Sequence, residues 1–289
     1  MTTQSIAILG TGSMGSRIAS RLLSAGYSVT VWNRSSTATK PLAAQGATVA
    51  STPKQAAKNA DIVISMVTDD EASKAVWFTP ETGATVGLKP GTIALESSTL
   101  SVAYTQMLAA EIATTGASFL AAPVVGSRPQ AEAGSLTYLI GGPSGTLANV
   151  HSLLKTTGNV VHYIGDASQA MALKLAVNSL FGIQVAALGE SLAFLRNNGI
   201  SADKAMNCLR GLPIMSPAAD GAGTLIVSGN HAPLFPVDLV EKDFRYMLQM
   251  AEALNAIMPA TTAIHQVYQE AIAQGYGSSN ITSVVSLFA

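Results

Sequence analysis

Short apolar runs rich in β-branched residues alternate with amphipathic stretches over the first 165 residues of the chain. The runs are bounded by Gly, Pro, Asp or Ser, which is typical of strands. The stretches between them, such as 16–25 and 53–59, suit helices. Alternation of this kind predicts a mostly parallel sheet covered by helices on both faces. We expect strands at 6–9, 28–32, 61–66, 92–96, 118–121 and 135–140.

Beyond Gly165 no further run has the character of a strand, and helical patterns continue to the C-terminus. We therefore predict an α/β domain over 1–165 and an all-α domain over 166–289, joined by a long helix over 167–196. Because no flexible linker separates them, the domains are expected to be held against each other with a cleft between them.

Part of the long helix, 175–195, is apolar enough to raise the question of a membrane span. Asn178, Gln184 and Glu190 interrupt this segment. A buried central helix has the same composition, so we expect no membrane contact.

The chain is poor in charge, with 48% hydrophobic and 11% charged residues. We therefore expect part of its surface to be covered in a homodimer or homotetramer. A formal net charge of −1 provides no basic surface for nucleic acid. A single cysteine, Cys208, and four dispersed histidines fit no metal site. The first residues lack the basic and apolar segments of a secretory signal, which favours the cytoplasm.

A glycine-rich loop follows the first expected strand and leads into a helical pattern, which is the strand–turn–helix setting of a dinucleotide-binding Rossmann domain. In such a loop the first glycine makes a tight turn, the second lets the backbone approach the pyrophosphate, and the third permits close packing. The alternative is a glycine-rich turn of another α/β fold. The loop consists of Gly10, Thr11, Gly12, Ser13, Met14 and Gly15.

The end of the second expected strand indicates which dinucleotide is used. A site specific for NAD places Asp or Glu here, whereas this chain has Asn33, Arg34 and Ser35. Arg34 can pair with a 2′-phosphate through two parallel hydrogen bonds, and its neighbours offer neutral hydrogen bonds. We therefore predict NADP(H), although a solvated charge at a strand end would also place an arginine here.

Three further motifs occur in order along the chain: 121–127 (AAPVVGS), Lys174 followed by Asn178 after a glycine at 165, and Lys242–Asp243. Together with the glycine loop, they resemble the β-hydroxyacid dehydrogenase family, which includes 3-hydroxyisobutyrate dehydrogenases and glyoxylate/succinic semialdehyde reductases. The resemblance covers nearly the whole chain. It implies hydride transfer between NADPH and a small aldehyde, a keto acid or the corresponding hydroxy acid.

Hydride addition to a carbonyl leaves negative charge on oxygen, so the site needs a proton donor there. Lys174 lies on an otherwise apolar helix, where burial disfavours the charged ammonium and eases proton transfer. Asn178 shares its face one turn later and can hold the substrate oxygen. The family assigns lysine and asparagine these same catalytic roles. The alternative is a snorkelling lysine beside a surface amide.

The resemblance implies softer roles for other residues. Gly126 and Ser127 would contact a substrate carboxylate. Lys242 would lie on the nicotinamide side of the site, and Asp243 would support Lys242 and contact the substrate. The ends of two strands would line the cofactor, with the second strand also reaching the substrate. These residues are Met66, Val67 and Thr68 after one strand, and Ser98 and Thr99 after the next.

Departures from the family pattern concern the substrate. Val125 stands where the family has a serine, Ser168 and Ala170 replace glycines, and Ala38 stands where a lysine is common. Loss of a hydrogen bond at Val125 puts a compact hydroxy acid in doubt as the substrate. Two alternatives stay open. One is reduction of a cyclic imine, against which Lys174 argues, and the other is an NADPH-binding protein without catalysis.

Overall fold

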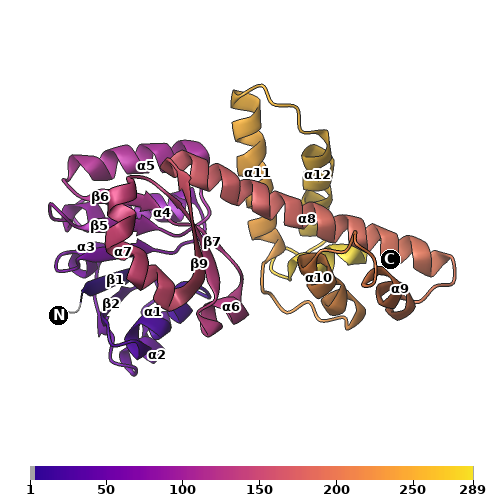
Figure 1. The fold of residues 1–289 in the computed structure, drawn as a ribbon, viewed down its shortest axis with the longest axis horizontal. Coiled ribbons are helices and arrows are strands. Elements are labelled where there is room, and N and C mark those ends of the chain that lie inside the picture. The colour runs from indigo at the N-terminus through magenta and orange to yellow at the C-terminus, as the bar shows by residue number, and fades with distance from the viewer. Residues whose placement is uncertain (1–3, 289) are drawn as a thin grey trace. The chain divides into compact units, whose positions relative to one another are not determined.

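A computed structural model describes residues 4–288 of the chain (Figure 1). The chain divides into two compact units, the first ending at Lys174 and the second beginning at Leu175. The division falls inside the long helix α8 (Ala167–Asn197). The α/β class of the first unit and the helical class of the second agree with the sequence-based prediction.

Among the described residues of the first unit, nine strands form one sheet. Six of them run parallel in the order β3-β2-β1-β4-β5-β6, and β8 continues the sheet antiparallel to β6. The strands are β1 (Ser5–Leu9), β2 (Ser28–Trp32), β3 (Thr48–Val49), β4 (Ile62–Ser65), β5 (Ile93–Glu96), β6 (Ser118–Ala121), β7 (Val124–Val125), β8 (Leu136–Gly141) and β9 (Gly158–Gly165).

The six expected strands are confirmed, whereas β3, β7 and β9 were missed. Two of these three are only two residues long, too short for a period to be read. The third, β9, is largely exposed and pairs with β8. Its run of β-branched and aromatic residues over 160–164 was an available signal for a strand.

The central strands are buried on both faces, as a parallel sheet requires. Ile6 and Ile8 of β1 point to one apolar core, whereas Ala7 and Leu9 belong to the core on the opposite face. The helices that cover the sheet are α1 (Gly15–Ser24), α2 (Lys40–Ala43), α3 (Pro53–Ala57), α4 (Asp70–Phe78), α5 (Val102–Thr114), α6 (Arg128–Ala133) and α7 (Ser144–Thr157).

The second unit is helical. Apart from an isolated bridge between Pro236 and Asn280, its described residues contain no strand. The fully buried ring of Phe244 packs beside Tyr268, whose hydroxyl donates to the Gly182 carbonyl at 2.9 Å. With the rest of α8, its elements are α9 (Ala202–Leu209), α10 (Pro217–Val227), α11 (Val237–Ala253), α12 (Pro259–Ala273) and a final 3-10 helix (Ile281–Phe288).

By length and composition, α8 is the helix of the described chain that is apolar enough to cross a membrane, with a mean hydropathy of 1.5 in its most apolar window. Half of that window is buried inside the protein. Core helices pass the same criterion, so it is weak evidence for a membrane span.

Candidate active site

An added Cβ would meet different surroundings at each of the three glycines in the loop after β1. Gly10 has a φ of +97°, and a Cβ there would collide with the Met66 carbonyl oxygen. A Cβ on Gly15 would collide with the Gly10 carbonyl oxygen. A Cβ on Gly12 would meet no atom within 4 Å. Packing within the protein therefore explains Gly10 and Gly15, but the bare backbone at Gly12 faces open space and fits a cradle for a ligand.

The helix after this loop is suited to an anion. Helix α1 begins at Gly15 without a capping side chain and without an acidic residue in its first turn. Its N-terminal amides and the positive end of its dipole can therefore interact with phosphate oxygens. These features, with the open face of Gly12, fit the pyrophosphate of a dinucleotide.

Asn33 connects the glycine loop to the end of β2. Its Oδ1 accepts a hydrogen bond from the Thr11 amide at 2.9 Å, and its Nδ2 donates to the Ser35 carbonyl at 3.1 Å. Arg34 and Ser35 are exposed beside it. The end of β2 therefore presents a cation and neutral groups, with Asn33 as a scaffold.

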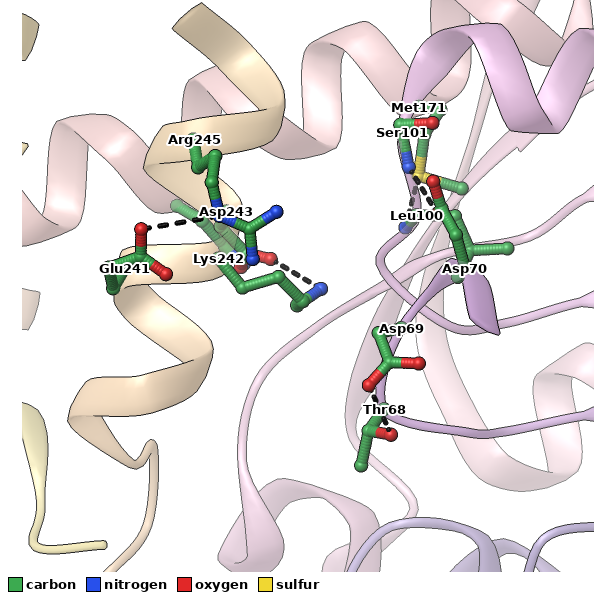
Figure 2. A network of polar contacts seen from close by, with 11 residues as sticks. Thr68, Asp69, Asp70, Leu100, Ser101, Met171, Glu241, Lys242, Asp243 and Arg245 are labelled. Atoms are coloured by element: carbon green, nitrogen blue, oxygen red, sulfur yellow. Dashed lines mark hydrogen bonds and ion pairs between the residues drawn. The ribbon is translucent and has the colours of Figure 1, made fainter. Parts of the chain in front are cut away.

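The loops after β4 and β5 are joined by hydrogen bonds. The Val67 amide donates to Ser98 Oγ at 2.8 Å. The Ser101 amide donates to Asp70 Oδ1 at 2.9 Å, as Figure 2 shows. Ser98 is buried, whereas Met66, Val67 and Thr99 are half-buried and Thr68 is exposed. The structure thus brings the two expected strand-end groups together, but the Ser98 side chain is turned inward.

A buried carboxylate that was not among the expected site residues lies behind these loops. Glu96, the last residue of β5, is fully buried and accepts hydrogen bonds from Ser73, Trp77 and Ser98. Burial raises the pKa of its carboxyl, and these hydrogen bonds oppose that effect. An acidic residue at the end of an otherwise apolar strand was the available signal.

The motif expected to hold the substrate forms a strand and the start of a helix. Val125 pairs with Thr137 in the β7–β8 ladder and is half-buried. Gly126 has a φ of +125°, which favours glycine. Ser127 is the N-cap of α6 and forms a capping box, in which its amide donates to Gln130 Oε1 at 2.9 Å. The capping box fixes the direction of the Ser127 side chain.

Lys174 lies on α8 with only 6% of its surface exposed. Asn178 follows four residues later on the same helix, which places it on the same face at a rise of about 6 Å. Before Lys174, the sulfur of Met171 accepts the Leu100 amide at 3.3 Å (Figure 2). This contact connects the loop after β5 to the helix that carries Lys174.

In the second unit, Asp243 holds two partners. Asn178 Nδ2 donates to Asp243 Oδ2 at 2.6 Å, and Lys242 Nζ lies 2.8 Å from Asp243 Oδ1. The ammonium of Lys242 also lies 4.8 Å from the ring centroid of Tyr246. Because a carboxylate cannot donate, its contact with Asn178 turns the amide nitrogen toward Asp243 and leaves Asn178 Oδ1 as the acceptor end.

Removal of Asp243 is expected to destabilise the protein strongly. Asp243 and Lys242 are both buried, so Asp243→Leu leaves a buried cation without its counter-ion, at a cost of about 3 kcal/mol in the free energy of unfolding. Chemical denaturation measures this loss. Adding Lys242→Met removes the unpaired charge and should restore part of the stability; equal stability of Asp243→Leu and the wild type would contradict the assignment.

Within residues 4–288, no group of three or more His, Cys, Asp and Glu side chains is placed to hold a metal ion. The donor set of the candidate site is instead amides, hydroxyls and cationic side chains. Such groups suit phosphates, carboxylates and carbonyl oxygens.

Comparisons with known proteins match both parts of the chain. Residues 5–165 match the family described as the NAD binding domain of 6-phosphogluconate dehydrogenase. Residues 168–288 match the family described as the NAD-binding of NADP-dependent 3-hydroxyisobutyrate dehydrogenase.

Similar whole proteins include chloroplastic glyoxylate/succinic semialdehyde reductase 2 of Arabidopsis thaliana, which is 30% identical over 98% of this chain and 79% of its own length. An uncharacterized oxidoreductase of Bacillus subtilis, YfjR, is 33% identical over 97% of this chain and 98% of its own length. The crystal structure of a 3-hydroxyisobutyrate dehydrogenase from Salmonella typhimurium has a TM-score of 0.89 at 26% identity, over 98% of this chain and 99% of that one. An imine reductase from Pseudomonas sp. shares the fold, with a TM-score of 0.66 at 22% identity over 100% of both chains.

Proposed function

Because this chain belongs to the β-hydroxyacid dehydrogenase family of NAD(P)-dependent oxidoreductases, which act on CH–OH and C=O groups, we propose that it uses NADPH to reduce a small aldehyde or keto acid. The substrate would be of the semialdehyde or glyoxylate type, and the reverse reaction would oxidise the corresponding hydroxy acid. The observation that carries the proposal is the placement of buried Lys174 and of Asn178 four residues apart on α8, with the Asn178 amide held by Asp243.

The cofactor would be held by the glycine loop and the end of β2. Gly12 and the amides at the start of α1 would receive the pyrophosphate, and exposed Arg34 would pair with the 2′-phosphate. When bound, the cofactor supplies the hydride that is added to the carbonyl carbon. No carboxylate at Asn33, Arg34 or Ser35 would repel a 2′-phosphate, which favours NADPH over NADH.

In the reduction, the Lys174 ammonium would donate a proton from Nζ to the carbonyl oxygen as the carbon receives the hydride. The oxygen becomes a hydroxyl, and the neutral amine regains its proton from solvent. Asn178 Oδ1 would accept a hydrogen bond from the substrate hydroxyl, since Nδ2 is directed to Asp243. In the oxidation, the neutral Lys174 amine would take the proton back.

We expect the protein to bind the carboxylate of its carbonyl substrate weakly. Val125 supplies no hydrogen bond, which leaves the hydroxyl of Ser127 and the backbone of Gly126 as the polar groups of this motif. Removing one polar partner from a charged ligand weakens binding by roughly tenfold or more. A semialdehyde, with its carboxylate distant from the reacting carbon, tolerates this loss better than a compact hydroxy acid.

NADPH consumption with a panel of glyoxylate, succinic semialdehyde and cyclic imines tests the proposal. Turnover of aldehydes or keto acids is expected, with NADPH preferred to NADH. Turnover of imines alone would favour the second candidate, imine reduction, for which apolar Val125 is the favouring feature. NADPH binding without any turnover would contradict the catalytic proposal and favour a binding protein.

Arg34→Ala is expected to weaken NADPH binding by roughly 10- to 100-fold, because a charge-assisted bidentate contact to the 2′-phosphate is lost. NADH, which has no such phosphate, should bind the variant as it binds the wild type. Fluorescence titration of each cofactor measures this difference. Lys58→Ala, which removes another exposed cation of the same unit, is the matched control. Equal losses for both cofactors would contradict the role of Arg34.

We also propose that the protein assembles as a homodimer or homotetramer. The apolar residues Leu180 and Phe194 on α8 are 60% and 66% exposed. Their exposure supports the proposal that a second copy of the chain covers this part of the helix. Light scattering coupled to size exclusion measures the mass in solution. A monomer at micromolar concentration would contradict this proposal.

A further inference from the structure

Each carboxylate oxygen of Glu96 faces a donor that cannot become an acceptor. Trp77 Nε1 donates to Oε2 at 2.9 Å, where Ser73 Oγ also donates at 2.9 Å. The backbone amide of Ser98 donates to Oε1 at 3.1 Å. An indole N–H and a backbone N–H only donate, so the residue at position 96 must present two acceptors.

Ser98 connects this carboxylate to the neighbouring loop. Its backbone amide donates to Glu96 Oε1 at 3.1 Å, and its side-chain Oγ accepts the Val67 amide at 2.8 Å. Glu96, Ser98 and Val67 thus form one directed chain of hydrogen bonds from the core to the end of β4.

The same loop is also fixed on its other side. The Leu100 amide donates to the Met171 sulfur, and the Ser101 amide donates to Asp70 (Figure 2). These contacts hold the loop after β5 to α8 and to the start of α4. Glu96 is the anchor at the strand end, from which the loop departs.

These loops lie at the carboxyl ends of β4 and β5, where open α/β sheets bind ligands. With Arg34 after β2 at the adenosine side, β4 and β5 lie on the other side of β1 in the sheet, which is the half expected to receive the nicotinamide. Errors in the placement of backbone at a ligand weaken binding even when no contact is removed.

We propose that Glu96 is a positioning residue which, through Ser98, sets the loops after β4 and β5 in the conformation that binds the nicotinamide half of the cofactor. The inference rests on the proposed function. It gives Ser98 a structural role, since its backbone amide donates to Glu96 and its hydroxyl oxygen accepts the Val67 amide.

Ser98→Ala and Ser73→Ala form a matched pair that tests this role. Both remove one buried hydroxyl beside Glu96, but only Ser98 also contacts the Val67 amide. We expect Ser98→Ala to raise the Kd of NADPH by roughly tenfold. Ser73→Ala should leave that Kd within about twofold of the wild type, with a comparable loss of thermal stability. Fluorescence titration and thermal unfolding give the two readouts without any substrate.

Glu96→Gln provides a second variant, because its amide nitrogen must face Trp77 Nε1 or the Ser98 amide, both of which only donate. Its Kd for NADPH should rise at least as much as that of Ser98→Ala. The variant that combines Glu96→Gln with Ser98→Ala should bind NADPH no more weakly than Glu96→Gln alone, since both substitutions act through one chain of hydrogen bonds.

Equal effects of Ser98→Ala and Ser73→Ala on the Kd would overturn the inference, even if both variants lose stability. If Glu96→Gln does not fold, the serine pair still decides. A wild-type protein that binds no NADPH would instead refute the proposed function. The two failures are therefore distinguishable.

Discussion

Lys174→Met is expected to lower kcat by about 10²- to 10⁴-fold, the range typical of a lost general acid. The variant keeps most of the apolar volume of the side chain, and the Lys174 position is almost fully buried, so packing is largely retained. The residues expected to contact the cofactor, including the glycine loop and Arg34, are left unchanged by the substitution. The Kd of NADPH should therefore change by less than about threefold.

Lys174→Arg separates proton donation from electrostatic stabilisation. Arginine keeps the positive charge but does not give up its proton at ordinary pH. If Lys174 is the general acid, Lys174→Arg should be as slow as Lys174→Met in single-turnover measurements. Activity close to the wild type in the arginine variant would mean that charge alone suffices. Activity close to the wild type in Lys174→Met would refute any catalytic role.

The first unit was predictable because its strands are buried on both faces, which leaves continuous apolar runs between glycine and acidic boundaries. Burial does not explain the omission of β9: its residues are mostly exposed beside β8, but its run over 160–164 is rich in strand-forming residues. Helix α8 was predicted within a residue at its C-terminal end, because its long apolar pattern ends at Asn197 and Gly199.

The parts of the candidate site that neighbouring residues form could be predicted from sequence motifs. The parts that depend on contacts between residues far apart in the chain could not. The glycine loop follows from the sequence, since its turn and helix are formed by neighbouring residues. The contact of Asn178 with Asp243 joins residues 65 positions apart. The partners of Glu96 on α4 likewise come from another element. Such contacts depend on how elements pack, which spacing along the chain does not reveal.

Gly12→Ala is expected to weaken NADPH binding by roughly 100-fold without loss of stability. A methyl group at this position meets no protein atom within 4 Å, and the φ of Gly12 is not in the left-handed region. Folding should therefore be unaffected or slightly favoured, since alanine restricts the unfolded chain. The same methyl group would occupy the space through which a pyrophosphate approaches the backbone. Titration of NADPH and thermal unfolding measure the two effects.

Gly15→Ala and Gly145→Ala are the matched comparisons for this prediction. A Cβ on Gly15 collides with the Gly10 carbonyl oxygen, so Gly15→Ala should lose about 2–4 kcal/mol of stability. Gly145 is exposed on α7 and, like Gly12, has no atom within 4 Å of an added Cβ. Gly145→Ala should therefore leave both stability and NADPH affinity nearly unchanged. If Gly12→Ala also retained wild-type affinity, the open space beside Gly12 would not be the pyrophosphate site, and the cofactor assignment would lose its main structural support.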